Sequence, residues 1–473
     1  MGLFDRLRGD DKPRVAFFGI DGVPYSFLES HFDEFENLAA LAEEGSAGAI
    51  DSIVPPESSA CWPALTTGTN PGETGVYGFQ EREPGSYDTY VPMGNDVQAD
   101  RLWDRVAETG RDATVMNVPV TFPPQRNVQR MVSGFLSPGL DRAARPDKLQ
   151  SYLESIDYRI DVDAKLGHDP DKTDFIEDAH ATLEARFEAF HHYVEHDDWD
   201  LFFGVFMTPD RVNHFLFRDY EHTGEYDEAF EDLRGERLDE TEYETYLEHG
   251  PYKEEFLEFY RTLDDYLGQL RDALPDDVTM IVASDHGFTS LDCEVYCNRW
   301  LAEQGWLDFE DDDHESLSDI SEDTRAYSLI PGRFYLNLEG REPSGAVAEE
   351  DYDDARDELK SMLQELKGPD GRPVADRVVE KEKAFRGDHA DLGPDLVVIP
   401  NDGYDLKSGF KPQDVVFDIG PRNGMHTFEN ASLFVDDPDA RIDDADLYDV
   451  APTILDLMDI EYERNELDGS SLV

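Results

Sequence analysis

The chain has 473 residues and an extreme excess of acid, with 108 Asp and Glu against 41 Lys and Arg and a formal net charge of −67. Because 39% of the residues are hydrophobic and 11% are aromatic, the chain can bury a large core, and the charge does not indicate disorder. So strong a negative field repels polyanions, which excludes duplex nucleic acid as a partner. It is typical of proteins from very salty water, where screening over about 3 Å at 1 M salt weakens self-repulsion.

The three cysteines, Cys61, Cys293 and Cys297, form no CxxC pair. Neither a disulfide framework nor a cysteine zinc site is expected. The first 13 residues hold no apolar stretch of signal-peptide length, and no later apolar run approaches the length of a membrane span. We therefore expect a cytoplasmic protein without a membrane span.

Short, nearly continuous apolar runs alternate with helical sequence along most of the chain. Such runs are typical of strands in a parallel sheet that is covered on both faces. We predict an α/β fold with a doubly wound, mostly parallel sheet, helices on both faces and helical cap insertions. The expected strands are residues 14–20, 48–54, 113–118, 130–136, 202–207, 279–284, 333–338, 395–400 and 431–435.

The α/β domain is expected to span residues 12–473. In three of its sections the regular alternation of apolar runs and helical sequence is interrupted. Residues 138–198 are polar and predict a helical insertion, and residues 300–390 predict an auxiliary α/β section. Residues 216–265 are acidic and rich in tyrosine. Since they begin directly after His214, we expect them to form a cap over the site that follows.

Six residues of metal-ligand type lie near points where a hydrophobic strand gives way to a turn. A parallel sheet gathers the C-terminal ends of its strands at one edge, where ligands bind, so these residues are candidates for a single site. Imidazole and carboxylate groups suit zinc or manganese, and six ligands exceed the three or four that one catalytic ion needs. We therefore expect two divalent ions. The six residues are Asp21, Asp210, His214, Asp285, His286 and His426.

The segment after Pro55 and Pro56 supplies candidate nucleophiles. Two ions about 4 Å apart can hold the attacking and leaving oxygens of an in-line displacement at phosphorus, and such a reaction needs a nucleophile. Ser58 and Ser59 stand at the start of a predicted helix. N–H donors and the positive end of the helix dipole favour a phosphoryl oxyanion there, and a metal ion would lower the pKa of the hydroxyl.

These motifs, in this order, resemble the type I phosphodiesterase/nucleotide pyrophosphatase branch of the alkaline phosphatase superfamily over nearly the whole chain. Its PDxxGH element is similar to residues 209–214, with Asn213 in place of the glycine, and its DHG element is similar to residues 285–287. In that family the nucleophile lies ten residues before the glycine of a Thr-Gly pair. Counting back from Gly68 favours Ser58 over Ser59.

The resemblance implies a phosphoric ester hydrolase that acts through a phosphoseryl intermediate on Ser58, and the composition indicates a haloarchaeal-like member. It also implies two divalent ions, zinc with manganese as the alternative. Their ligands would be Asp210, His214 and His426 for one ion, and Asp21, Ser58, Asp285 and His286 for the other.

Three residues are expected to contact the substrate, a small phosphate ester or nucleotide. Cys61 stands where the resemblance implies an Asn that binds a phosphoryl oxygen, Asn117 offers an amide at a strand end, and Arg211 adjoins Asp210. A monoester dianion needs an additional cation, and no basic residue adjoins Ser58. We therefore expect diesters or pyrophosphates as substrates, with Arg211 or Arg422 as the side chains that would favour a monoester by reaching the phosphate.

Other functions remain open at this point. A phosphomonoesterase, or a phosphomutase similar to cofactor-independent phosphoglycerate mutase, would share the ligands, although the mutase's NSEVGH-like setting is absent. A non-enzymatic, acidic metal-binding protein is the third alternative. The HxxEH pattern at residues 192–196 fits an inverted zinc-peptidase motif, but we interpret it as the polar end of a helix. The acidic residues 310–313 are interpreted as a solvated surface.

Overall fold

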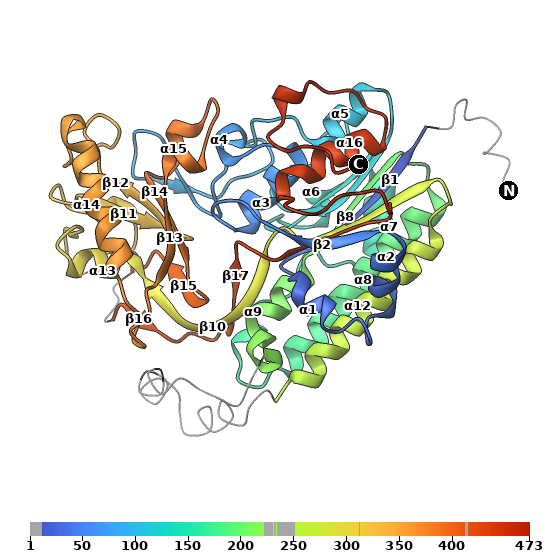
Figure 1. Cartoon of the computed structure of the whole chain (residues 1–473), viewed down its shortest axis with the longest axis horizontal. Coiled ribbons are helices and arrows are strands. Elements are labelled where there is room, and N and C mark those ends of the chain that lie inside the picture. Colours follow the sequence, from blue (N-terminus) through green and yellow to red (C-terminus); the bar gives the residue numbers. More distant parts are fainter. Residues whose placement is uncertain (1–11, 222–229, 231–232, 234–250, 312, 412–414) are drawn as a thin grey trace.

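The computed structural model describes residues 12–221, 230, 233, 251–311, 313–411 and 415–473 (Figure 1). An eight-stranded sheet lies at its centre, in the order β2-β18-β9-β1-β8-β5-β6-β7. The five strands from β9 to β6 are mutually parallel, and β18, β2 and β7 pair antiparallel at the two edges. The predicted α/β fold with a mostly parallel sheet is therefore confirmed. The strands are β1 (Arg14–Ile20), β2 (Ser46–Ile50), β5 (Ala113–Val118), β6 (Arg130–Ser133), β7 (Ala144–Arg145), β8 (Leu201–Phe206), β9 (Val278–Ala283) and β18 (Ala431–Val435).

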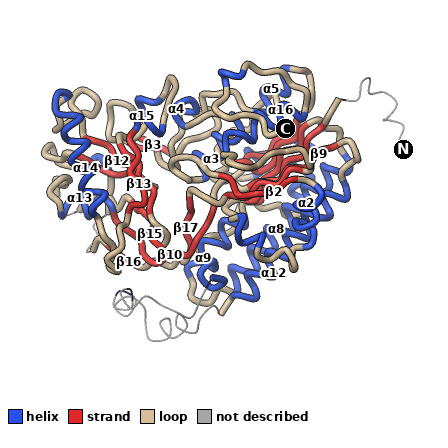
Figure 2. The backbone as a smooth tube through the Cα atoms, viewed as in Figure 1, coloured by secondary structure: helices blue, strands red, loops and turns tan. Residues whose placement is uncertain are grey.

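Both faces of this sheet are covered by helices. Alternate side chains of a strand point to opposite faces, and in β1 Val15 and Phe17 enter one core while Ala16, Phe18 and Ile20 enter the other. Figures 1 and 2 show the helical layers on the two sides. One face carries α2 (Glu36–Glu44), α8 (Thr173–His196), α9 (Thr208–Glu221) and α12 (Lys253–Ala273), and the other carries α3 (Ser58–Thr67), α5 (Leu102–Glu108) and α16 (Val450–Leu457).

A second, antiparallel sheet forms a smaller lobe with its own core, in the order β11-β12-β14-β13. Two runs expected in the main sheet, residues 333–338 and 395–400, lie here instead. An apolar run indicates a buried strand but not the sheet to which it belongs, and both runs pack under the helices of the smaller lobe. Its elements are β11 (Ala326–Leu329), β12 (Arg333–Leu336), β13 (Ala375–Glu380), β14 (Leu396–Pro400), α13 (Cys297–Glu303) and α14 (Tyr352–Glu365).

A long strand, β10 (Gly287–Tyr296), connects the two parts of the molecule (Figure 1). It begins after Ser284, Asp285 and His286, the three residues that follow β9, and pairs along its length with three further strands. β17 contacts the first half of β10, and β15 and β16 contact its second half. These strands are β15 (Gly403–Lys407), β16 (Phe417–Asp418) and β17 (Gly424–Thr427).

The expected insertions differ in how much of them the structure describes. Residues 138–198 contain α6 (Leu140–Ala143), α7 (Asp147–Ser155) and α8, with only β7 as a strand. Most of the expected cap at 216–265 lies outside the described residues. Its described ends belong to α9 and α12, and α12 packs against α2, α8 and α9.

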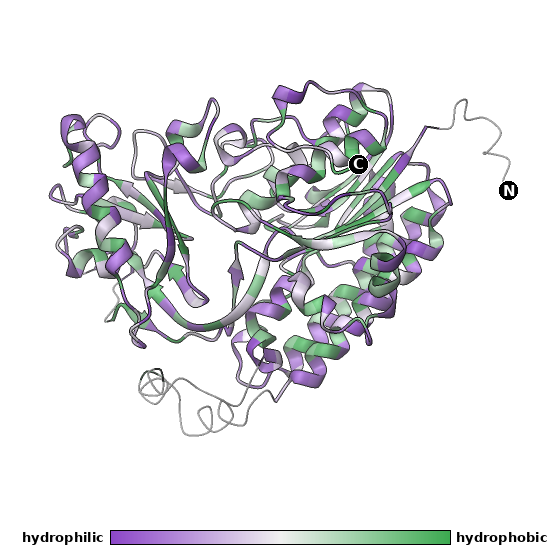
Figure 3. Ribbon diagram, in the orientation of Figure 1, coloured by the Kyte–Doolittle hydropathy of each residue, from purple (hydrophilic) through white to green (hydrophobic). Residues whose placement is uncertain are grey.

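Apolar residues concentrate in the strands and on the inward sides of the helices, while hydrophilic residues cover the outside (Figure 3). None of the helices in the described part of the chain is long and apolar enough to cross a membrane.

Candidate active site

The parallel strands bring the predicted carboxylates to one edge of the sheet. Asp21 directly follows β1, Asp285 lies two residues after β9, and Asp210 lies in the first turn of α9, which follows β8. The strands end in register, since Ile20 aligns with Phe206 and the Asp21 N–H donates to the Phe206 carbonyl at 3.0 Å. The three carboxylates therefore meet although they are far apart in sequence.

Ser58 is brought to the same edge by α3. Two prolines end the preceding segment, and the carboxylate of Glu57 accepts a hydrogen bond from the Ser59 N–H at 3.1 Å, which caps the helix. Ser58 is thus the first residue of α3, with its side chain beside Asp21. The helix ends at Gly68, whose φ of 69° favours glycine.

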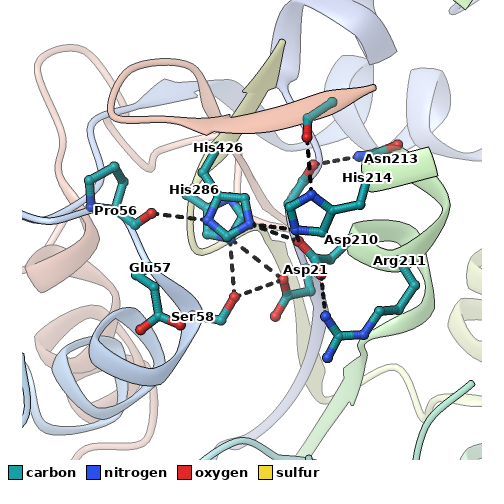
Figure 4. A network of polar contacts seen from close by, with 12 residues as sticks. Asp21, Pro56, Glu57, Ser58, Asp210, Arg211, Asn213, His214, His286 and His426 are labelled. Carbon is teal, nitrogen blue, oxygen red and sulfur yellow. Dashed lines mark hydrogen bonds and ion pairs between the residues drawn. The ribbon is translucent and has the colours of Figure 1, made fainter. Parts of the chain in front are cut away.

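Three ligand atoms of the first expected group converge (Figure 4). Nε2 of His426 lies 3.1 Å from Oδ1 of Asp210 and 3.1 Å from Nε2 of His214. Nε2 of His214 lies 3.4 Å from the same Asp210 oxygen. One divalent ion among these atoms would have the ligand types expected for zinc or manganese.

The second expected group lies beside the first. Oγ of Ser58 is 3.3 Å from Oδ1 of Asp21 and 3.2 Å from Nε2 of His286. The same imidazole nitrogen is 3.7 Å from Oδ1 of Asp21 and 3.6 Å from Oδ2 of Asp285. The His286 ring also stacks on the His426 ring with centroids 3.8 Å apart, so the two groups are contiguous. All seven residues expected to bind metal are therefore gathered in one place.

Each of the three histidines turns Nε2 toward the centre of the site and Nδ1 toward a backbone carbonyl. Nδ1 of His214 donates to the Gly424 carbonyl at 3.1 Å, Nδ1 of His286 to the Gly287 carbonyl at 3.0 Å, and Nδ1 of His426 to the Pro56 carbonyl at 3.1 Å. Because a carbonyl only accepts, these bonds place the proton on Nδ1 and leave the Nε2 lone pair for a cation. Burial lowers the pKa of His214 and His286, which favours the neutral imidazoles that bind metals.

The carboxylates carry more negative charge than the surrounding side chains balance. Burial, then the nearby Asp285 and Asp210, raise the pKa of Asp21 well above its usual range. Burial and Asp210 raise the pKa of Asp285 to about 7. Burial opposes ionisation of Asp210 too, but the adjacent imidazoles and Arg211 hold its pKa well below the usual range. Oδ2 of Asp285 is buried without a hydrogen-bond partner in the described structure. Divalent cations would balance this excess negative charge and accept the lone pairs that no hydrogen-bond donor uses.

Residues that were not anticipated orient the carboxylates and the strand ends. Nε1 of the fully buried Trp62 donates to Oδ2 of Asp21 at 2.6 Å. Asn213, which stands in place of the glycine of the PDxxGH element, donates to the Gly22 carbonyl and accepts from the Tyr260 hydroxyl, both at 2.7 Å. No short-range sequence signal marks these contacts, because they join residues 41, 191 and 47 positions apart.

The residues expected to bind substrate have different positions. Arg211 lies at the site, where its guanidinium contacts Oδ2 of Asp210 at 3.0 Å and Oδ2 of Asp161 at 3.0 Å. Cys61 does not line the cavity at the site; one turn along α3 from Ser58 it faces the core, and its thiol lies 3.4 Å from the Ser52 hydroxyl.

Asn117 also lies away from the cavity. It is fully buried beneath the sheet edge, where its side-chain amide donates to the Ile160 carbonyl at 3.1 Å and accepts from the Arg186 guanidinium at 3.2 Å. The expectations for Cys61 and Asn117 rested on nearness in sequence to Ser58 or to a strand end. Their side chains point into the core instead, and neither is among the residues that line this cavity.

A cavity of about 270 Å³ opens at Ser58 and extends toward the smaller lobe. Its floor is the site itself, and its walls come from both parts of the molecule. Most of the wall is apolar, which suits an organic group attached to phosphorus. The lining includes Phe79, Phe135, Met207, Ile330, Pro331, Val398, Leu406 and Met425, together with the charged side chains of Glu57, Asp405, Lys407 and Arg422.

An α/β sheet with a buried carboxylate and imidazole centre at its C-terminal edge, beside a serine at a helix N-terminus, is the arrangement of the phosphoric ester hydrolases of the alkaline phosphatase superfamily. Within that class, the sequence profile described as type I phosphodiesterase/nucleotide pyrophosphatase matches residues 15–429. The chain belongs to this family, as the order of its motifs predicts. Among curated protein sequences, none matches it.

Solved structures share the fold over almost the whole chain. Phosphonoacetate hydrolase from Sinorhizobium meliloti, in complex with phosphonoacetate, superposes with a TM-score of 0.59 at 16% identity, covering 95% of this chain and 96% of that one. Murine ectonucleotide pyrophosphatase/phosphodiesterase 5, in an inactive form with AMP, superposes with a TM-score of 0.54 at 13% identity, covering 97% and 98%. These similarities support the α/β fold.

Proposed function

We propose that this protein hydrolyses phosphoric diesters or pyrophosphates through a phosphoryl intermediate on Ser58, in a centre that holds two divalent ions. The observation that carries the proposal is the common orientation of the three histidines. Each commits Nδ1 to a carbonyl and turns Nε2 toward buried carboxylates beside one serine hydroxyl. An acidic protein that binds metal only at its surface would not need this arrangement.

Ser58 is the proposed nucleophile. Oγ attacks phosphorus, the bond from phosphorus to the leaving oxygen breaks, and that oxygen departs with the electron pair and takes a proton from solvent. The Ser58 proton is lost to solvent before the attack. Water then cleaves the phosphorus–Oγ bond and restores the hydroxyl. When bound, the two ions lower the pKa of the hydroxyl and stabilise the charge on the attacking and leaving oxygens.

The chain's own groups hold this geometry. Asp210, His214 and His426 face the leaving oxygen, while Asp21, Asp285 and His286 surround Ser58. Arg211 acts as a positioning residue, because two carboxylates already occupy its guanidinium. Among the residues that the structure describes, no free cation then lies directly beside Ser58, and the apolar cavity walls favour a diester over a monoester dianion.

Replacing the nucleophile tests this mechanism. Ser58→Ala should abolish turnover while it leaves the metal content nearly intact. Ser59→Ala is the matched control and should keep most of the activity, since among the described residues the Ser59 hydroxyl hydrogen-bonds only to Glu57, at 3.3 Å. Turnover of a nitrophenyl phosphodiester by Ser58→Ala at the wild-type rate would refute the assignment.

Two further measurements separate the alternatives. Metal analysis after dialysis in high salt should find about two tightly bound zinc or manganese ions; many weak, interchangeable calcium ions would indicate a non-enzymatic acidic protein. A preference of tenfold or more for the mono-nitrophenyl ester over the bis-nitrophenyl diester, about 1.4 kcal/mol, would favour a monoesterase. Isomerisation of 3-phosphoglycerate without free phosphate would favour a mutase.

We also propose that the protein works at very high salt, as a haloarchaeal-like member of the family. The support is its net charge of −67. Self-repulsion of this size opposes the compact state unless ions screen it.

A further inference from the structure

Three cationic side chains line the cavity, and two of them are already neutralised. Arg211 contacts Asp161 and Asp210, each at 3.0 Å. Lys407 is hydrogen-bonded to Asp405, and its ammonium lies 3.7 Å from Glu294. Neighbouring carboxylates therefore already balance the positive charge of each of these two side chains.

Arg422 is the third cation, and it has no such partner. Within the described ranges of the chain it makes no hydrogen bond and no ion pair, although it is half-buried in the cavity wall. Its charge acts on Asp405, which is already held by Lys407, and on the neutral His214. Although acidic residues outnumber basic ones by 108 to 41, this arginine lines the cavity beside the site without an ion pair to any carboxylate in the described structure.

The backbone fixes Arg422 on one side of the site. The next residue, Asn423, donates its N–H to the His214 carbonyl at 2.8 Å, and Gly424 accepts the Nδ1 proton of His214 at 3.1 Å. Arg422 therefore stands beside the Asp210, His214 and His426 group. In an in-line displacement the leaving oxygen departs on the side opposite Ser58, which is this side of the site.

We propose that Arg422 binds a second anionic group of the substrate, a phosphate or a carboxylate carried by the leaving group. This inference rests on the proposed function and narrows it to phosphoric esters or anhydrides whose leaving group is itself anionic, such as pyrophosphate. The guanidinium presents paired N–H donors that match two oxygens of either anion. Much of the cavity wall is apolar, which strengthens a contact between charged groups.

The test compares three substrates with one nucleotidyl group and different leaving groups. A nucleoside 5′-triphosphate leaves pyrophosphate, a carboxyphenyl ester of the nucleoside 5′-monophosphate leaves a carboxylate-bearing group, and a nitrophenyl ester leaves a group with no second anion. In Arg422→Gln, kcat/KM should fall roughly 10- to 100-fold for an anionic leaving group, as expected for a lost charge-assisted hydrogen bond, and less than about threefold for the nitrophenyl ester. Arg422→Lys should recover part of the loss.

The control is Arg126→Gln, which removes an exposed arginine outside this cavity and should leave all three substrates unaffected. If Arg422→Gln lowers kcat/KM with the triphosphate alone, the second anion is a phosphate. If it does so with the carboxyphenyl ester alone, the second anion is a carboxylate. A loss with both substrates indicates a general anion site. An equal loss for all three substrates, or no loss, would overturn the inference. If the wild-type enzyme turned over none of them, the proposed function itself would fail and the inference with it.

Discussion

Trp62→Phe should weaken metal binding without unfolding the protein. The indole Nε1 donates to Oδ2 of Asp21 at 2.6 Å, and both residues are fully buried. Phenylalanine has no donor, so the carboxylate would lose its orienting partner at a cost of about 1–3 kcal/mol. Since Asp21 is a proposed metal ligand, we expect the affinity for the ion, and kcat/KM, to fall roughly 10- to 100-fold, as is typical when such a supporting contact is lost.

A second tryptophan provides the matched control. Trp103 is also fully buried, in the same core, and its indole donates to Gln125 away from the site. Trp103→Phe removes the same volume, so both variants should lose similar thermal stability, while only Trp62→Phe should lose metal affinity in a competition titration with a chelator. Equal metal affinity in the two variants would refute the role of this hydrogen bond.

Three further predictions concern pH, packing and salt. In metal-free protein, burial and Asp210 raise the pKa of Asp285 from the usual 3.8 to about 7. Between these values the folded state keeps a proton that the unfolded state has lost, so stability should fall from about pH 4 to about pH 7 and level off above it. Thermal unfolding of chelated protein from about pH 4 to 9 should show this decline and plateau, and a flat profile would contradict it. Asn213→Leu leaves the Gly22 carbonyl and the Tyr260 hydroxyl without partners, and should lower the free energy of unfolding by roughly 3 kcal/mol, whereas Tyr260→Phe should cost about 1 kcal/mol. Similar unfolding curves for wild type and Asn213→Leu would exclude this bridging role. Unfolding midpoints should rise steeply from low to multimolar KCl, and salt-independent midpoints would rule out halophily.

The core of the site follows from the sequence because most of its proposed metal ligands stand next to strands. Apolar runs end at Asp21, Asp285 and shortly before Asp210, and a parallel sheet brings such ends together. His426 is different, since it lies on β17, which reaches the site by pairing with β10. Its place beside an apolar run made it one of the six candidates, and the resemblance to a family assigned it to the group of Asp210 and His214.

The remaining features depend on three-dimensional packing that local patterns do not encode. The indole of Trp62 reaches Asp21 only because α3 packs across β1, and Asp161 meets Arg211 from 50 positions away. Cys61 is near Ser58 in sequence, yet its side chain points into the core. The apolar runs at residues 333–338 and 395–400 correctly predicted two strands. They did not predict that these strands pair in a separate sheet, because that pairing depends on tertiary contacts.

The most direct test of the mechanism is to trap the intermediate. Enzyme mixed with a nitrophenyl phosphodiester in high salt and quenched in acid within the first turnover should carry one phosphoryl group, still bearing the remaining ester, on Ser58 when its peptides are analysed by mass spectrometry. The Ser58→Ala variant should carry none. An adduct on Ser59 or another side chain, or turnover with no covalent adduct under conditions where its breakdown is slow, would contradict the proposed role of Ser58.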